Sequence, residues 1–161
     1  MYDVNAYREL YPPPDKKWRK LEIENKVSEV INDISKDYNV PPPEVIVVPS
    51  NYILQVSDGE TDIATYKPAI QRIYISPDMT LFDLCHEMGH HIENVKREKA
   101  GKHEKGMEEW RRSQEIPWEE RQSEKRAETF ALHCTVKYKD EWAKLFGDKR
   151  FMPWQRDKVI K

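Results

Sequence analysis

The sequence predicts an α+β fold in which a small, twisted mixed sheet packs on an N-terminal helix, a histidine-bearing helix and a glutamate-bearing helix. Three observations support this class. Apolar residues follow a helical period before residue 40, short β-branched and aromatic runs fill residues 44–76, and the helical period returns after residue 78. The chain has 161 residues, enough for one core. We therefore expect a single domain over 1–161, with a flexible N-terminal arm (1–14) and a C-terminal tail from about residue 143 to 161.

The first helix is predicted between two proline triplets, at 12–14 and 41–43, in the stretch "DKKWRKLEIENKVSEVINDISKDYN". Its apolar residues recur mostly at intervals of three and four, as an amphipathic helix requires. They are Trp18, Leu21, Val27, Val30, Ile31 and Ile34. Asp15 is a suitable N-cap because its carboxylate can accept a hydrogen bond from the first turn.

Three or four strands are predicted after the second triplet, in the runs "EVIVVPS", "YILQVS", "DIATYK" and "IQRIYIS". These runs are rich in β-branched and aromatic residues, and Pro, Gly, Asn or Asp separates them. The dipeptide Asp58-Gly59 is typical of a hairpin turn.

A second helix is predicted in "PDMTLFDLCHEMGHHIENVKREKAG", with Asp78 or Thr80 as its cap and Gly101 as its end. The next stretch, "KHEKGMEEWRRSQEI", has no apolar period and is predicted as a polar loop. Past Pro117, "WEERQSEKRAETFALHCTVKYKDEWAKLF" predicts a last, long helix.

The segment "CHEMGHH" places metal-binding residue types on one face of the second helix. With about 100° of turn per residue, His90 falls about 40° and Glu87 about 100° from His86. The apolar residues of this helix occupy the opposite face, and they are Leu81, Leu84, Met88, Ile92 and Val95. Two imidazoles one turn apart can bind one zinc ion, and Glu87 can reach a water on that ion. The alternative is a chance polar face on a surface helix.

Two neighbours of these residues have separate expected roles. Gly89 is unfavourable inside a helix, so we expect another element to pack closely there, in particular the glutamate-bearing helix. His91 falls at the margin of the apolar face, so we expect it to pack or to donate a hydrogen bond rather than to bind metal.

A third ligand is sought in "SEKRAETFALHC" on the last helix, where Glu124 and Glu128 border the apolar face. Taken alone, both glutamates could be surface charges paired with Lys125 or Arg121. A site at the two histidines needs a third protein ligand, however, which favours a carboxylate on this border. His103 remains a fallback ligand or a donor on the substrate side.

The motif "HEMGH" and the later "ExxAExFA", whose Glu124 lies 34 residues after His90, resemble the gluzincin metallopeptidases. The closest likeness is to minigluzincins and ImmA/IrrE-type peptidases, although "LHCTVKY" lacks the latter's Leu-Leu-x-Pro ending. The resemblance covers about residues 70–135. It implies a zincin-like fold, zinc held by His86, His90 and Glu124, and Glu128 supporting a ligand histidine from behind, where Asn or Asp is usual.

The function predicted from these residues is zinc-dependent hydrolysis of a peptide or protein substrate, with Glu87 as general base. The substrate would lie along an edge strand, "TDIATYK", and Tyr66, His103 and Tyr138 are candidate donors to the oxyanion. One alternative is a latent peptidase whose cleft is blocked by the C-terminal tail. Another is a zinc-bearing interaction module that does no chemistry.

The composition of the chain indicates which kinds of partner and which cellular compartment to expect. The formal net charge is −2 and the pI is about 6.2, so no basic bias points to nucleic acid. No segment approaches the ~20 apolar residues of a membrane span, and the N-terminus has no signal-peptide run. Two cysteines, Cys85 and Cys134, are expected to be buried and reduced, and the protein to be cytoplasmic. The oligomeric state is left open.

Overall fold

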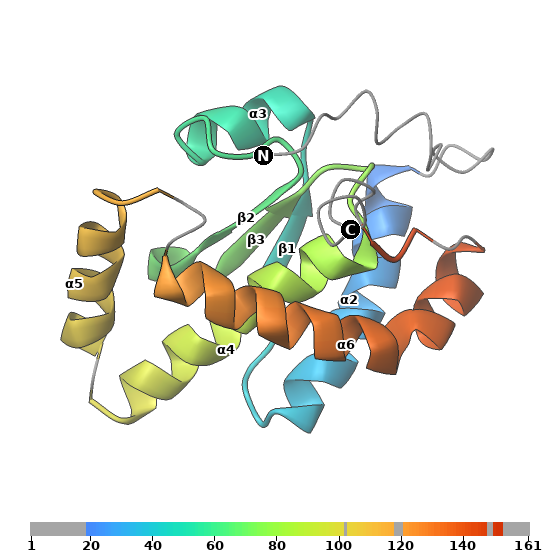
Figure 1. The fold of residues 1–161 in the computed structure, drawn as a ribbon. Helices are drawn as coiled ribbons and strands as arrows, with labels where there is room; N and C mark the ends of the chain where they lie inside the picture. The colour runs from blue at the N-terminus through green and yellow to red at the C-terminus, as the bar shows by residue number, and fades with distance from the viewer. Residues whose placement is uncertain (1–18, 102, 118–120, 148–149, 153–161) are drawn as a thin grey trace, which may run out of the picture.

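The computed structural model describes residues 19–101, 103–117, 121–147 and 150–152, and its elements form an α+β fold (Figure 1). The predicted class and the mixed sheet are confirmed. The elements are α2 (Lys20–Asp37), β1 (Glu44–Val47), α3 (Ser50–Val56), β2 (Ala64–Lys67), the 3₁₀ turn η1 (Pro68–Ile70), β3 (Arg72–Ile75), α4 (Leu81–Lys99), α5 (His103–Ser113) and α6 (Gln122–Phe146). Within the described residues, no helix has both the length and the apolar character needed to cross a membrane.

The three strands are ordered β1-β3-β2, with β1 parallel and β2 antiparallel to β3. In the central strand, Ile73 pairs with Val45 on one side and Tyr66 on the other. Ile73 and Ile75 face the core, while Tyr74 faces α3 and packs edge-on against Tyr52. β2 is therefore an edge strand among the described strands, and its inward face contacts α4.

α2, α4 and α6 form the helical layer of the core, with α6 crossing α4 in front of the sheet (Figure 1). The buried side of α2 carries Ile23, Val27, Val30, Ile31 and Ile34. Leu21, expected on this side, is 67% exposed, and Asp15 lies outside the described residues. The C-terminal half of α6 reaches back to α2, where Tyr138 donates a hydrogen bond to Asp37 and Lys26 donates to the carbonyl of Leu145.

The predicted strand "YILQVS" is wrong, because these residues form the short helix α3. A strand needs a neighbouring strand to bond with, and this segment has none among the described strands. As a helix it buries Ile53 alone and leaves its other residues toward the surface. The Asp58-Gly59 pair ends the helix and makes no hairpin. Both residues have positive φ, and their N–H groups donate to the carbonyls of Gln55 and Leu54, which is a Schellman motif.

The predicted polar loop after α4 is also wrong, because residues 103–113 form α5. Its Lys, Glu and Arg residues have high helix propensity even without an apolar stripe. Ion pairs hold the helix in place. Glu109 lies 2.6 Å from Arg97 of α4 and 2.7 Å from Arg126 of α6, and Glu93 of α4 completes a square with both arginines.

The C-terminal segment 150–152 packs at the beginning of α4. The N–H groups of Leu81 and Phe82 donate to the carbonyls of Arg150 and Phe151, at 3.1 and 2.9 Å. Phe151 and Met152 pack against the core. Because the first N–H groups of a helix have no partner within it, these carbonyls replace water at the start of α4.

Candidate metal centre

α4 begins at a well-defined cap. The Thr80 hydroxyl accepts a hydrogen bond from the N–H of Asp83, and the Asp83 carboxylate accepts from the N–H of Thr80, which forms a capping box. Of the two predicted caps, Thr80 is therefore the one used. Gly101, with φ of 71°, follows the last turn as expected. The predicted apolar face is buried throughout, from Leu81 to Val95.

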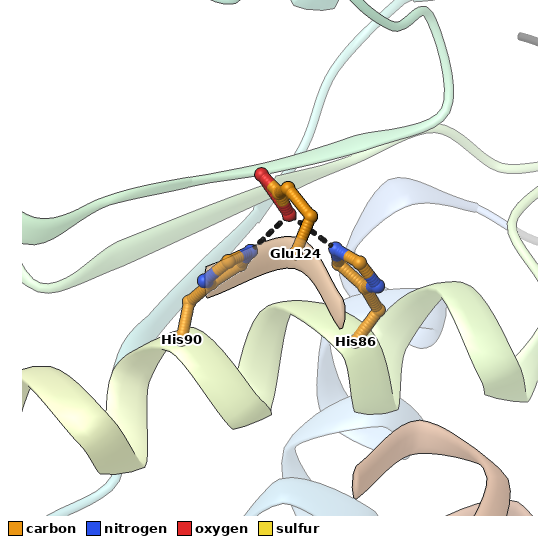
Figure 2. A group of neighbouring side chains, drawn as sticks. All are labelled: His86, His90 and Glu124. Atoms are coloured by element: carbon orange, nitrogen blue, oxygen red, sulfur yellow. Dashed lines mark hydrogen bonds and ion pairs between the residues drawn. The ribbon is translucent and has the colours of Figure 1, made fainter. Parts of the chain in front are cut away.

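His86 and His90 project from neighbouring turns of α4 toward the same carboxylate (Figure 2). The Nε2 atoms of His86 and His90 lie 2.9 and 2.7 Å from one oxygen, Glu124 Oε1. The two rings meet edge to face, with centroids 5.0 Å apart. His86 is buried and the other two residues are half-buried.

Close packing of α6 on α4 delivers Glu124 to this position. Glu124 lies in the first turn of α6, and Ala127 and Ala131 are buried at the contact with α4. A methyl group on Gly89 would lie 3.1 Å from Phe130 Cδ1 and 3.4 Å from the Ala127 backbone. This confirms that Gly89 admits the glutamate-bearing helix.

Burial and their mutual contact set the ionisation of Glu124 and His90. Burial opposes the charge of Glu124, but the hydrogen bonds from the two histidines hold the pKa of Glu124 well below its usual range. Burial likewise opposes a charged His90, but the bond to Glu124 and the nearby carboxylates raise the pKa of His90 to about 9. An ionised Glu124 only accepts hydrogen bonds, so both Nε2 atoms carry protons here.

The three ligand atoms fit a divalent metal ion. They lie within 4.8 Å of one another. Among the described residues, His86, His90 and Glu124 are the one group of His, Cys, Asp or Glu side chains close enough together to hold an ion. Tetrahedral zinc, with bonds of about 2.0–2.2 Å, separates neighbouring ligand atoms by about 3.3 Å. The observed distances of 2.9 and 2.7 Å therefore need to open by only about half an ångström.

Glu87 lies beside the group without joining it. Burial raises the pKa of Glu87 to about 7, against the opposing influence of His86 and His90. A carboxyl group that titrates near neutral pH can both accept and release a proton there.

The structure places Glu128, one of the two further candidate residues, but does not describe the side chain of the other, His103. Glu128 Oε1 lies 3.9 Å from Nδ1 of His86, the ring nitrogen that faces away from Glu124. A carboxylate behind a ligand histidine orients its ring and increases its basicity. The side chain of His103, at the start of α5, lies outside the described part of the structure.

His91 makes hydrogen bonds away from the metal group, which fits its expected role as a hydrogen-bonding residue. The side chain is fully buried, with Nδ1 2.8 Å from the hydroxyl of Tyr66 and Nε2 2.7 Å from the carbonyl of Pro41. The hydroxyls of Tyr66 and Tyr138, named above as oxyanion donors, are thus bonded to His91 and to Asp37 respectively. Neither hydroxyl points to an oxyanion above the metal group.

Cys85 and Cys134 are both buried free thiols, as expected. Burial, with each thiol next to the other, raises the pKa of the Cys85 thiol. Neutral thiols bind metal poorly, so this pair contributes to packing between α4 and α6.

No family model, no curated protein and no solved structure matches this chain. The geometry of the side chains is therefore the basis on which a function can be argued.

Proposed function

We propose that this protein is a zinc-dependent peptidase of the gluzincin type. The observation that carries the proposal is the convergence of His86 Nε2 and His90 Nε2 on one oxygen of Glu124, with the Glu87 carboxyl group beside them. Two imidazoles and one carboxylate are a ligand set that zinc accepts in catalytic sites, where a fourth position is left for water or substrate.

The residues of the chain have distinct roles in this proposal. His86, His90 and Glu124 would hold the ion, and Glu128, 3.9 Å from Nδ1 of His86, would orient that ring. Zinc, when bound, polarises a carbonyl group and lowers the pKa of water. Glu87 accepts a proton from the attacking water and transfers it to the leaving amine, and burial, which raises the pKa of its carboxyl group, makes it a stronger base.

The outer edge of β2, the side that faces away from β3, offers a place for an extended substrate. The N–H of Ser76 donates to the carbonyl of Ile63, so pairing with β3 continues at every second residue. The main-chain groups of Ala64 and Tyr66 consequently point away from β3. A peptide can add to such an edge as a further strand, and the edge strand expected from the sequence, "TDIATYK", contains both residues.

The test is to compare wild-type protein with Glu87→Gln, each loaded with zinc, on a mixed peptide library. The amide keeps the shape of the side chain and removes the base, so hydrolysis should fall by about 10²–10⁴-fold while zinc content stays at one ion per chain. Glu98→Gln, an exposed change on the same helix, serves as the matched control and should leave the rate unchanged.

Two outcomes would oppose the proposal. Hydrolysis that survives Glu87→Gln at the wild-type rate would assign the base to another group. A zinc-loaded wild-type protein that cleaves no peptide would favour the zinc-bearing interaction module.

A further inference from the structure

Tyr66 has two functions at once in the structure, one through its main chain and one through its side chain. Its N–H and C=O groups belong to the outer edge of β2, as argued above from the pairing with β3. Its side chain stands out of the plane of the sheet and enters the core, where it packs edge-on against the ring of His91 with centroids 5.4 Å apart. Tyr66 therefore joins the outer edge of β2 to the metal-bearing helix.

The hydrogen bonds around this phenol run in one direction. The carbonyl of Pro41 can only accept, so Nε2 of His91 carries the proton and its Nδ1 accepts from the Tyr66 hydroxyl. The amide of Asn94 donates to the same hydroxyl at 3.0 Å and to the carbonyl of Pro68 at 3.3 Å. Both ring nitrogens of His91 and the hydroxyl of Tyr66 have hydrogen-bond partners in this network, which fixes both the His91 ring and the phenol.

These hydrogen bonds connect α4 with the segment before β1 and the segment after β2. His91 follows the ligand His90 directly, and Asn94 lies one turn further along α4. Pro41 precedes β1, and Pro68 follows β2. Directional hydrogen bonds as well as apolar packing thus set the position of β2 above α4. Apolar packing alone would let β2 slide along α4 more easily than these bonds do.

We propose that Asn94, Tyr66 and His91 are positioning residues that hold the outer edge of β2 in register with the metal-bearing helix. An extended peptide added to that edge then has a backbone carbonyl above the His86, His90 and Glu124 group. The inference rests on the proposed function for the direction in which the substrate lies. A displacement of about 1 Å between substrate and catalytic groups can lower a rate by about a hundredfold, so a rigid link here has a functional reason.

The test separates binding at the metal from binding along the edge. Two probes are titrated into the zinc-loaded protein: acetohydroxamic acid, which engages the metal alone, and a mixture of N-acetyl dipeptidyl hydroxamates, which engages the metal and the edge. The ratio of the two affinities measures the contribution of the edge. In the wild type we expect this ratio to be tenfold or more, since each main-chain hydrogen bond adds to affinity.

Tyr66→Phe should lower the affinity ratio about tenfold and leave acetohydroxamic acid binding unchanged. Tyr74→Phe is the matched control, because Tyr74 is a buried tyrosine of β3 whose hydroxyl accepts from Arg72 and, among the described residues, makes no bond to α4. This control should keep the wild-type ratio. Asn94→Leu, which removes the donor to the phenol and to the carbonyl of Pro68, should lower the ratio less but in the same direction.

A nitrogen NMR spectrum of His91 gives a readout that needs neither activity nor a ligand. We expect a protonated Nε2 and an acceptor Nδ1, with the Nδ1 shift moving in Tyr66→Phe and not in Tyr74→Phe. Equal affinity ratios in all variants, or a wild-type ratio near one, would overturn the inference. A protein that shows the expected ratios but hydrolyses nothing would refute the proposed function alone.

Discussion

Glu124 and Glu128 lie one turn apart on α6, yet they meet the histidines from different sides. Glu124 Oε1 contacts the Nε2 atoms of both His86 and His90, whereas Glu128 approaches only the far nitrogen of His86, at 3.9 Å. In the proposed site, Glu124 would bind the ion, whereas Glu128 at 3.9 Å would act on His86 only from behind.

This difference predicts unequal losses of zinc affinity. Glu124→Ala removes a ligand atom, so zinc affinity should fall by more than a hundredfold. Glu128→Ala removes only the support of a ligand, so the loss should be about tenfold to a hundredfold. Competition with a chromophoric chelator measures both constants. Full zinc retention in Glu124→Ala would exclude this residue as the third ligand.

At the residue scale, spacing was enough to place His86, Glu87 and His90, because an α-helix fixes the angle between residues. It was not enough for Tyr66, which was considered as an oxyanion donor. The partners of its hydroxyl come from α4, some 25 residues along the chain, and no local pattern reveals them. Asn94 was missed for the same reason, although its position one turn after His91 was a usable signal.

At the scale of elements, the contact of α4 with α6 depends on the absence of a side chain at Gly89. Its Cβ position lies 3.1 Å from the Phe130 ring and 3.4 Å from the Ala127 backbone. The first neighbour can shift, but the second is main chain and can move only with the helix.

Gly89→Ala should therefore weaken zinc binding although Ala favours helix by about 1 kcal/mol over Gly. The gain in helix propensity and the overpacking should leave stability nearly unchanged, while the displaced α6 lowers zinc affinity about tenfold. Adding Phe130→Leu should restore part of that affinity by making room. A single variant that is about 1 kcal/mol more stable with unchanged zinc affinity would contradict this account.

The element boundaries show where sequence patterns suffice. α2, α4 and α6 were predicted because each has a long apolar stripe. α3 was predicted as a strand because "YILQVS" has β propensity, which packing overrides. α5 was predicted as a loop because ion pairs to α4 and α6, rather than an apolar face, hold it. Interactions between distant charges leave no periodic signal.

At the scale of the whole molecule, the described end of the chain, residues 150–152, contributes to the start of α4. These residues supply two carbonyls to the start of α4 and pack Phe151 and Met152 on the core. The rest of the expected C-terminal tail, residues 153–161, lies outside the described residues. The described part thus supports a structural cap on α4.

Two truncations should give different results. Ending the chain after residue 149 removes both acceptors and the apolar contacts, so the free energy of unfolding should fall by roughly 3 kcal/mol. Ending it after Met152 should change stability little. Urea unfolding of both proteins measures this. If the protein that ends after Met152 hydrolysed peptides faster than the full-length protein, that result would instead support a latent peptidase blocked by its tail.

The contacts of α6 with α2 also have a kinetic consequence. Lys26 and Leu145 are 119 residues apart, while His86 and Glu124 are 38 apart. The entropy of loop closure grows only with the logarithm of loop length, so joining the more distant pair costs only about 1 kcal/mol more. Contacts over such separations nevertheless slow folding, because they form late in the search. Since α6 carries Glu124, the metal group should assemble in the same late step that brings α2 and α6 together.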